Sequence, residues 1–596
     1  MSPSHHSFEN LIEMFEKSVE SFADRDLFGV KTEGRYQWAT YGEVGQSVDA
    51  FRGGLSSLGV SATDKVAVIS NNSPMWAIGA YATYGLGAQY VPMYEAQVEK
   101  DWRYILKDSG AKVLLVSTEA IYERTRGFVE ELEELEHVIL LSGSSEGATT
   151  YEDLKDRGVQ SPVASVSPSR EDICGFIYTS GTTGEPKGVL LSHWNLVSNI
   201  NAIHSLFPME SDDVSLSFLP WAHSFGQTCE LHCMVSYGAA IGLAVSVETI
   251  IENLPEVQPT LLFSVPRIFN RIYDGVQKKM AAAGGIKLKL FGATMNAANK
   301  RRALAERGES SPLLDLKHAV LDKIVASKVR ERFGGRLRYA FSGGAALSKE
   351  VGLFIDNLGI KVYEGYGLTE TSPIVSANRP GGQKIGSIGQ CIPGVTVKIM
   401  PTETAPEGQG EIVVYGPNIM QGYHNLPEKT AEVMTEDGGF RTGDMGRKDE
   451  EGYLWITGRV KEQYKLENGR YVVPAPMEEQ LKLSPLINQV MIDGANRPFN
   501  VAIIVPDLES LKAWAQDNGV AYDSDAQLCA HEDAHGRIGQ ELETYGAQFK
   551  GYERVKRWAL AAEEFSPAND MLTPTLKLKR RNVMTAYESV ISELYE

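Results

Sequence analysis

The sequence predicts an α/β protein that is divided into several domains. Over the first 170 residues, short apolar runs such as Val66–Ile69, Val113–Val116 and Val138–Leu141 alternate with helical patterns. This rhythm is typical of βαβ units around a largely parallel sheet. A second region with the same rhythm extends from Asp172 to about Gly365. Because 596 residues are too many for a single hydrophobic core, we expect two βα subdomains here and further domains after them.

One stretch of the first region resembles a membrane span, because residues 66–94 include no charged residue. A spanning helix needs about 20 consecutive, predominantly apolar residues. This stretch is rich in Gly, Ala, Tyr, Asn and Ser, and it is broken by Pro74 and Pro92. We therefore expect two buried strands around a buried helix, at Val66–Ser70, Met75–Tyr84 and Gln89–Met93.

The second region contains four predicted strands, and a charged helical insert separates the last two. Its strands are expected near Gly175–Tyr178, Val214–Leu219, Leu261–Val265 and Leu337–Ser342. Between Arg267 and Gly335 lies a charged helical insert with a lysine-rich middle. Its helices are expected at Arg271–Ala283 and Leu313–Phe333. We interpret the insert as a solvated helical face; the alternative is a basic helix that rests on an anionic membrane surface, which its mixed charges disfavour.

The last third of the chain predicts two smaller units. From Ile385 to Trp455, short segments separated by Gly, Pro and Asp indicate a small β-rich subdomain. Beyond Arg459, strand and helix patterns alternate again, which indicates an α+β C-terminal region. No composition shift marks a linker between the two units.

Composition narrows the function classes. The formal net charge of −19 argues against a nucleic-acid partner, because a phosphate backbone requires a basic protein face. Five cysteines, mostly far apart, suit a reducing cytosol, and their spacing lacks the paired pattern of a zinc site. The N-terminus shows no basic segment followed by an apolar one, so we expect no signal peptide and a cytoplasmic protein.

The segment Tyr178–Val189, Tyr-Thr-Ser-Gly-Thr-Thr-Gly-Glu-Pro-Lys-Gly-Val, predicts a loop that holds nucleotide phosphates. Glycines permit close backbone approach, hydroxyls donate to phosphate oxygens, and the lysine adds positive charge. It is not a Walker A loop, because proline precedes the lysine and glycine follows it. The residues concerned are Thr179, Ser180, Gly181, Thr182, Thr183, Gly184, Lys187 and Gly188.

Two downstream motifs complete a nucleotide site. In Tyr363–Glu370, Gly365 and Gly367 let the backbone lie flat against adenine, Thr369 offers a hydroxyl, and Glu370 is a hard oxygen ligand that suits Mg²⁺. In the second motif, Asp444 can accept hydrogen bonds from both ribose hydroxyls, and Arg459 can donate to the same sugar.

These blocks, in this order, resemble the signature motifs of the adenylate-forming superfamily, which includes acyl-CoA synthetases, firefly luciferase and adenylation domains. The resemblance covers essentially the whole chain. It implies a large N-terminal domain (1–459) of two stacked βα subdomains plus a barrel-like β-rich subdomain, and a small mobile α+β C-terminal domain (460–596) that pivots at Lys461. It also implies that Thr179 and Glu370 bind Mg²⁺, and it assigns nucleotide binding to a set of residues. These are the loop residues above except Gly188, together with Gly343, Gly344, Ala345, Glu364, Gly365, Tyr366, Gly367, Thr369, Asp444 and Arg459.

The catalytic lysine is expected in Leu572-Thr-Pro-Thr-Leu-Lys-Leu-Lys-Arg580. This segment departs from the commonest family pattern and looks like the form found in long-chain synthetases. Alignment on Arg580 makes Lys577 the catalytic lysine, acting with Thr369 and Glu370, and Lys579 is the alternative. A lysine here would neutralise charge between the substrate carboxylate and the α-phosphate.

Further segments are similar to the long-chain fatty acyl-CoA synthetases, namely Val265–Tyr273, Leu321–Gly335 and Leu466–Pro474. In Leu219–Phe225 the family places a residue that lines the acyl tunnel. His223 is therefore a candidate gate residue, and a packed core histidine is the alternative.

The resemblance implies activation of a medium- to long-chain fatty acid by ATP, through an acyl-adenylate, to acyl-CoA, AMP and pyrophosphate. The partners are then a fatty acid, ATP and coenzyme A, with Mg²⁺ as cofactor, no membrane span and transient contact with a membrane surface. The sequence sets neither oligomeric state nor chain length. The alternatives are a ligase that loads acyl groups onto a carrier protein, a luciferase-type oxygenase, a non-catalytic acyl- or nucleotide-binding protein, and a P-loop ATPase.

Overall fold

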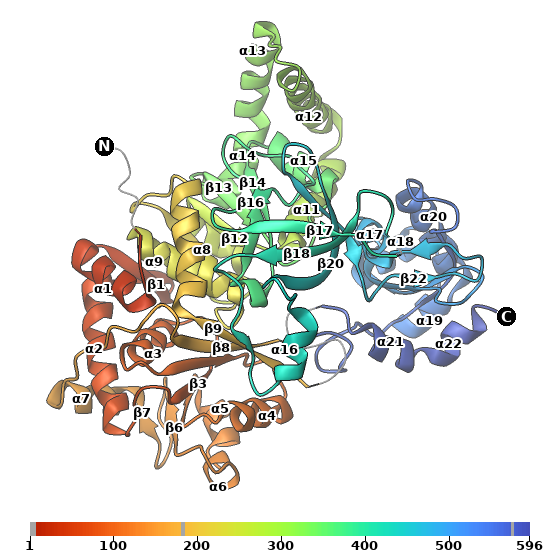
Figure 1. Cartoon of the computed structure of the whole chain (residues 1–596). Helices are drawn as coiled ribbons and strands as arrows, with labels where there is room; N and C mark the ends of the chain where they lie inside the picture. Colours follow the sequence, from red (N-terminus) through yellow and green to blue (C-terminus); the bar gives the residue numbers. More distant parts are fainter. Residues whose placement is uncertain (1–6, 180–184, 404, 574–576) are drawn as a thin grey trace.

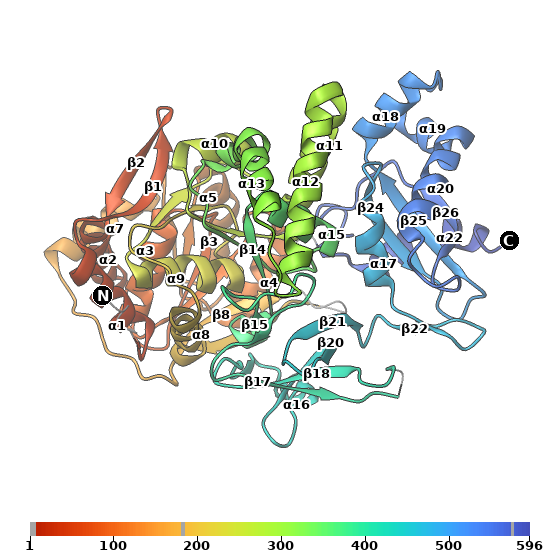
Figure 2. The ribbon, with the colours of Figure 1, turned by 90° about the horizontal axis from the view of Figure 1, so that it is seen from above.

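The structure is a computed structural model that describes residues 7–179, 185–403, 405–573 and 577–596. It is a mixed α/β protein with a large N-terminal domain and a small C-terminal domain (Figures 1 and 2). The predicted fold class is therefore confirmed. Two large sheets form the N-terminal domain, and three smaller sheets follow them along the chain.

The first large sheet has eight strands in the order β19-β9-β8-β4-β3-β5-β6-β7. Strands β3 to β6 pair in parallel, as the βαβ rhythm predicts. The strands are β3 (Lys65–Ile69), β4 (Gln89–Met93), β5 (Val113–Val116), β6 (His137–Leu140), β7 (Thr149–Thr150), β8 (Ile173–Thr179), β9 (Lys187–Ser192) and β19 (Gly422–Tyr423).

The second large sheet has nine strands in the order β16-β15-β14-β13-β12-β10-β11-β1-β2. Strands β10 to β14 are parallel, and β15 and β16 close the sheet in antiparallel pairing. The strands are β1 (Asp26–Thr32), β2 (Arg35–Thr40), β10 (Val214–Ser217), β11 (Ala240–Leu243), β12 (Leu261–Ser264), β13 (Tyr339–Ser342), β14 (Lys361–Gly367), β15 (Ile374–Ala377) and β16 (Gln390–Cys391).

The two sheets are not divided at residue 170 as the sequence rhythm indicated. Strand β1 joins the second sheet, where Phe28 pairs with Ile241. Strand β8 joins the first sheet, where Gly175 pairs with Tyr90. Periodicity specifies that a segment is a strand, whereas its neighbours depend on long-range packing that no local pattern encodes.

The uncharged stretch forms core, as predicted. Helix α3 (Pro74–Gly85) begins where the Ser73 side chain accepts a hydrogen bond from the backbone N–H of Trp76, and Pro74 fits the first helical position. Its residues from Trp76 to Gly85 are buried between the strands and neighbouring helices. No helix in the described part of the chain is long and apolar enough to cross a membrane.

Helices cover the sheets of the N-terminal domain. They are α1 (Leu11–Phe22), α2 (Tyr41–Ser57), α4 (Glu99–Ser109), α5 (Glu119–Thr125), α6 (Phe128–Glu131), α7 (Tyr151–Gln160), α8 (His193–Leu206), a π-helix (Phe225–His232), α9 (Cys233–Tyr237), α10 (Ile250–Val257) and α15 (Lys349–Asn357).

The charged insert is mostly helical, with a break at residues 306–311. It comprises α11 (Pro266–Ala283), α12 (Gly285–Ala305), α13 (Pro312–Leu321), a π-helical turn (Asp322–Ala326), α14 (Ser327–Arg330) and a 3₁₀ turn (Glu331–Phe333). Helices α12 and α13 form a hairpin that projects beyond the body of the molecule at the top of Figure 1.

The predicted β-rich subdomain is a four-stranded antiparallel sheet. Its strands are β17 (Thr396–Met400), β18 (Gly410–Tyr415), β20 (Phe440–Lys448) and β21 (Leu454–Arg459), with α16 (Pro427–Val433) beside them. Strand β21 ends at the predicted domain boundary, and Lys461 lies in the exposed turn that follows.

The C-terminal domain is built on a three-stranded sheet and contacts the N-terminal domain, where Lys278 Nζ on α11 donates to Ser510 Oγ at 2.9 Å. Its strands are β22 (Tyr464–Lys465), β23 (Tyr471–Val472), β24 (Ile487–Asp493), β25 (Asn500–Pro506) and β26 (Val555–Leu560). Its helices are α17 (Pro474–Leu481), α18 (Leu508–Asp517), α19 (Asp525–Ala530), α20 (Glu532–Gly546), α21 (Arg580–Ala586) and α22 (Glu588–Glu593).

Candidate active site

The predicted ribose-binding pair forms at the end of the β20–β21 hairpin. Asp444 and Arg459 are register partners across the two strands, and Arg459 Nε lies 2.9 Å from Asp444 Oδ1. Tyr366, from the distant strand β14, donates its hydroxyl to Asp444 Oδ2 at 2.7 Å. The structure thus brings two of the predicted motifs together at one buried carboxylate.

The chemistry of this carboxylate suits a sugar. Burial raises the pKa of Tyr366 well above 10, so its hydroxyl remains a donor at neutral pH. The Asp444 carboxylate raises the pKa of Arg459, which stays charged. A carboxylate offers about four lone-pair positions, and these two partners use one on each oxygen. Asp444 can therefore still accept hydrogen bonds from two ribose hydroxyls.

Thr369 and Glu370 lie on a single 3₁₀ turn (Thr369–Thr371) directly after β14. Thr369 Oγ1 lies 3.3 Å from Ser224 Oγ, and Glu370 Oε1 accepts a hydrogen bond from the Tyr423 hydroxyl at 2.9 Å. Within the described residues, no hydrogen bond or ion pair involves Glu370 Oε2. That oxygen fits the role of a hard ligand to Mg²⁺.

Lys187 begins β9 and pairs across the hairpin with Thr179, the last residue of β8. Its ammonium lies 4.6 Å from the centre of the Tyr423 ring. The β8–β9 hairpin confirms that two buried strands flank the phosphate loop. The predicted phosphate ligands Ser180, Gly181, Thr182, Thr183 and Gly184 lie outside the described residues.

Tyr423 is a site residue that sequence reasoning missed. Its ring faces Lys187 and its hydroxyl bonds Glu370, so it joins the phosphate-loop lysine to the predicted metal ligand. The placement depends on β19, whose Tyr423 pairs with Val189 of β9 across more than two hundred residues of chain. The only local signal is an aromatic residue after Gly422 in a turn-rich segment.

The predicted nucleotide-binding residues Gly343, Gly344 and Ala345 follow β13. Gly344 has φ of +80°, a conformation that favours glycine. On the adjacent strand β14, Gly367 is required for a different reason, because a Cβ there would lie 1.8 Å from the carbonyl oxygen of Pro373. The turn that carries Thr369 and Glu370 can therefore fold back only against a glycine.

Glu364 and Gly365 lie beside that loop on β14, where Glu364 pairs in register with Ser342. The Glu364 side chain is buried and accepts a hydrogen bond from the backbone N–H of Gly386 at 3.1 Å. Burial raises its pKa to about 7. Near neutral pH it therefore carries only part of a negative charge.

The structure separates the two candidate lysines. The backbone N–H of Thr573 donates to the Lys577 carbonyl at 2.8 Å, and the charges of Arg459, Asp444 and Glu370 act on the Lys577 ammonium. Desolvation is the main cause that lowers the pKa of Lys577, and the Arg459 guanidinium lowers it further. The carboxylates of Asp444 and Glu370 act in the opposite direction and raise it. Lys577 is accessible to solvent but surrounded by site residues.

Lys579 is engaged elsewhere. It forms an ion pair with Asp570 on the surface of its own domain. Its backbone N–H donates to the Met571 carbonyl at 2.9 Å, beside an antiparallel bridge between Leu572 and Leu578. The geometry therefore favours Lys577 over Lys579 as the residue that reaches the nucleotide.

His223 is half-buried between β10 and the π-helix. Its Nδ1 accepts a hydrogen bond from the backbone N–H of Phe225 at 3.2 Å. Burial lowers its pKa to about 4, and the nearby Lys577 ammonium adds to this effect, so the imidazole is neutral at pH 7. His223 precedes Ser224, which contacts Thr369, and it therefore adjoins the predicted catalytic residues.

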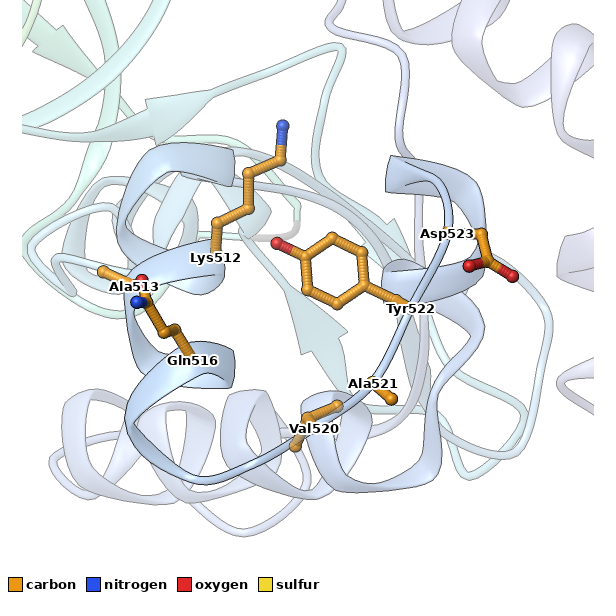
Figure 3. A pocket seen from close by; sticks show the side chains of 7 residues that line it. All are labelled: Lys512, Ala513, Gln516, Val520, Ala521, Tyr522 and Asp523. Carbon is orange, nitrogen blue, oxygen red and sulfur yellow. The ribbon is translucent and has the colours of Figure 1, made fainter.

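A surface depression of about 550 Å³ lies away from these residues. It lies in the C-terminal domain beside α18 and is lined by Lys512, Ala513, Gln516, Val520, Ala521, Tyr522 and Asp523 (Figure 3). Lys512 pairs with Asp525 at 2.7 Å. None of the predicted site residues lines this depression.

Comparisons with known proteins agree with this geometry. A family model described as AMP-binding enzyme matches residues 15–424. A model of the AMP-binding enzyme C-terminal domain matches residues 461–596. Among solved structures, the adenylation domain of a carboxylate reductase from Mycobacterium chelonae is 24% identical with a TM-score of 0.79, covering 98% of this chain and 91% of that one. ATP-bound MatB from Rhodopseudomonas palustris is 21% identical with a TM-score of 0.71, covering 98% and 99%. These structures show the fold.

Curated relatives are similar over almost the whole chain. Peroxisomal long chain acyl-CoA synthetase 6 of Arabidopsis thaliana is 31% identical, covering 100% of this chain and 87% of its own length. A long-chain-fatty-acid–CoA ligase of Mycobacterium tuberculosis is 33% identical, covering 94% and 93%. Human long-chain-fatty-acid–CoA ligase 1 is 30% identical, covering 98% and 86%. The chain therefore belongs to the AMP-binding enzyme family and, within it, to the long-chain acyl-CoA synthetases.

Proposed function

We propose that the protein is an ATP-dependent fatty acid–CoA ligase that converts a medium- to long-chain fatty acid to acyl-CoA through an acyl-adenylate. The proposal rests on one observation, that Lys577 of the C-terminal region interacts electrostatically with three charged residues of the N-terminal region. These are Asp444, Arg459 and Glu370. Family membership supplies the reaction class, and these residues supply the charges that the reaction needs.

In the first half-reaction, a carboxylate oxygen of the fatty acid attacks the α-phosphorus of ATP, and the bond to pyrophosphate breaks. Catalysis of such transfers is mainly positioning and charge neutralisation. Asp444 and Arg459 would hold the ribose, and Lys577 would stabilise the charge between the carboxylate and the α-phosphate. Lys187 and the loop hydroxyls would bind the departing pyrophosphate. Glu370 and Thr179 would hold Mg²⁺, which supplies further neutralisation of phosphate charge.

In the second half-reaction, the thiol of coenzyme A attacks the acyl carbon, its proton is lost, and AMP leaves. A free thiol has a pKa of about 8.5. The acyl-adenylate is a mixed anhydride, so the site must exclude water until the thiol arrives. We propose that the C-terminal domain, with its boundary between residues 459 and 460, rotates about Lys461 to withdraw Lys577 and admit coenzyme A. His223, neutral at pH 7, would line the acyl entrance.

We place the enzyme in the cytoplasm, with transient contact to membrane surfaces. Long-chain fatty acids partition into bilayers, so the substrate is most concentrated there. The chain carries no helix suited to cross a membrane within its described residues, and a surface contact suffices for access to the substrate.

The test is a product analysis. The purified protein is incubated with ATP, Mg²⁺, coenzyme A and saturated fatty acids of graded length. We expect AMP, pyrophosphate and acyl-CoA in equal amounts, with the rate over the series giving the chain-length preference. A parallel reaction without coenzyme A should retain fatty-acid-dependent ATP–pyrophosphate exchange. ADP and phosphate as products would contradict the proposal, as would acyl transfer only to an added carrier protein.

A further inference from the structure

The outer face of the α12–α13 hairpin bears an unusual apolar stripe. Leu313, Leu316, Val320 and Ile324 are 79%, 65%, 52% and 45% exposed. Their spacing of three, four and four residues places them along one side of a helix. A helix of a globular protein normally turns such a stripe toward its core. This one faces solvent.

Positive charge accompanies the stripe. Lys317, Lys323 and Lys328 are exposed on the same segment, and none of them forms an ion pair within the described part of the chain. The acidic residues of the segment, which made a membrane contact the less favoured interpretation of the sequence, are engaged by arginines and leave these lysines unpaired among the described residues. Asp315 lies 2.6 Å from Arg301, and Asp322 lies 2.7 Å from Arg330.

The hairpin, together with the π-helical turn and α14 that follow it, differs in charge from the rest of the molecule. Residues 285–330 contain ten Lys and Arg against four Asp and Glu, in a chain whose net charge is −19. The first turn of α12 repeats the pattern, since Ile286, Lys287, Leu288 and Lys289 are all exposed. Apolar and cationic side chains thus share the most prominent projection of the protein (Figure 1).

We propose that this hairpin docks the protein on the surface of an anionic lipid bilayer. The apolar side chains would enter the boundary between headgroups and acyl chains, and the lysine ammonium groups would remain beside the lipid phosphates. A second copy of the chain fits this face less well, because Lys317, Lys323 and Lys328 of one copy would then face the same lysines of the other. The projection of α12 and α13 beyond the body lets the stripe reach a flat surface without interference from the two domains.

Docking is independent of the proposed reaction, so it can be measured without turnover. Flotation with vesicles of phosphatidylcholine alone, or of phosphatidylcholine with phosphatidylglycerol, gives the partition coefficient. We expect binding to the anionic vesicles only, weakening as salt is raised. Each lysine near an anionic surface contributes about 1 kcal/mol, so Lys317→Gln/Lys323→Gln/Lys328→Gln should weaken binding roughly 100-fold.

The apolar stripe is tested by Leu316→Glu/Val320→Glu, which should also abolish flotation. The matched control is Val159→Glu, which replaces a 69% exposed valine on α7 and should bind like the wild type. Fatty-acid-dependent ATP–pyrophosphate exchange with a short, soluble acid should be the same in all variants, which shows that they are folded. If exchange is absent from every protein while flotation behaves as expected, the docking proposal stands and the proposed function fails.

Three results would overturn the docking proposal. The first is equal binding of the wild type to neutral and anionic vesicles, or to neither. The second is unchanged binding by the triple-lysine variant. The third is lipid-free, concentration-dependent self-association that Leu316→Glu/Val320→Glu abolishes, which would assign the stripe to a contact between copies.

Discussion

The sharpest prediction concerns the two lysines that the sequence leaves as alternatives. We expect Lys577→Ala to abolish most of the adenylation activity and Lys579→Ala to leave it nearly intact. Lys577 lies in the field of Arg459, Asp444 and Glu370, whereas Lys579 is paired with Asp570. The two substitutions remove the same side chain from positions two residues apart, so each serves as the control for the other.

The magnitudes follow from the two environments. Loss of one preorganised electrostatic stabiliser typically lowers a rate about 10²- to 10³-fold. The partner of Lys579 is 70% exposed, and an exposed ion pair is worth only ~0–1 kcal/mol, or less than about 5-fold. Lys577→Ala should therefore lower the adenylation rate by a factor at least ~20-fold greater than Lys579→Ala does.

The assay is fatty-acid-dependent ATP–pyrophosphate exchange at saturating ATP, with thermal unfolding as a control for folding. Thioester formation from supplied acyl-adenylate should survive in Lys577→Ala, because the lysine is expected to act only in the first half-reaction. Equal losses in the two variants, or a larger loss in Lys579→Ala, would refute the assignment. A Lys577→Ala enzyme that lost both half-reactions equally would refute the proposed withdrawal of the lysine.

Further outcomes are expected for three substitutions and for a change of pH. Lys187→Ala should impair adenylation yet spare thioester formation from supplied acyl-adenylate; equal loss of both would contradict a role confined to pyrophosphate. Tyr366→Phe should lower the free energy of unfolding by about 1.5–3 kcal/mol, measured with urea, because the buried Asp444 loses a donor; an unchanged midpoint would contradict this. Adenylation needs protonated Lys577, whose pKa is lowered from the value of about 10.4 for free lysine. The adenylation kcat/KM should therefore be lost as the pH rises through this lowered pKa. Asp444→Asn should shift this loss of activity to lower pH, since the Asp444 carboxylate raises the pKa of Lys577. A shift to higher pH would show that the coupling has the opposite sign.

The strands of the N-terminal domain could be predicted from local pattern because each is a short apolar run bounded by turns. The predicted strand at Gln89–Met93 has the bounds of β4, and that at Val113–Val116 has those of β5. Sheet membership could not be predicted. Whether β8 pairs with β4 or with a strand of its own region depends on packing between segments more than eighty residues apart.

The candidate site shows the same limit. Asp444 and Arg459 lie on consecutive strands, so a hairpin that joins them can be inferred from the sequence. The hydrogen bond from Tyr366 to Asp444 joins residues 78 apart. The contact of Tyr423 with Lys187 has no motif to signal it, because it arises from the two-residue strand β19. The role of residues within one segment can be predicted from the sequence, whereas contacts between distant segments become known only from the fold.

The charges around Lys577 give a physical reason for the proposed division of the active site between two domains. Desolvation by the surrounding side chains and the Arg459 guanidinium disfavour the charged form of Lys577, so its insertion into the free site costs energy. ATP brings negative phosphates that offset this cost, and the closed arrangement should be most stable while they are bound. Departure of pyrophosphate removes most of that negative charge, and the repulsion by Arg459 then favours withdrawal of the lysine. The same electrostatic balance that promotes adenylation would thus release the C-terminal domain for the second half-reaction.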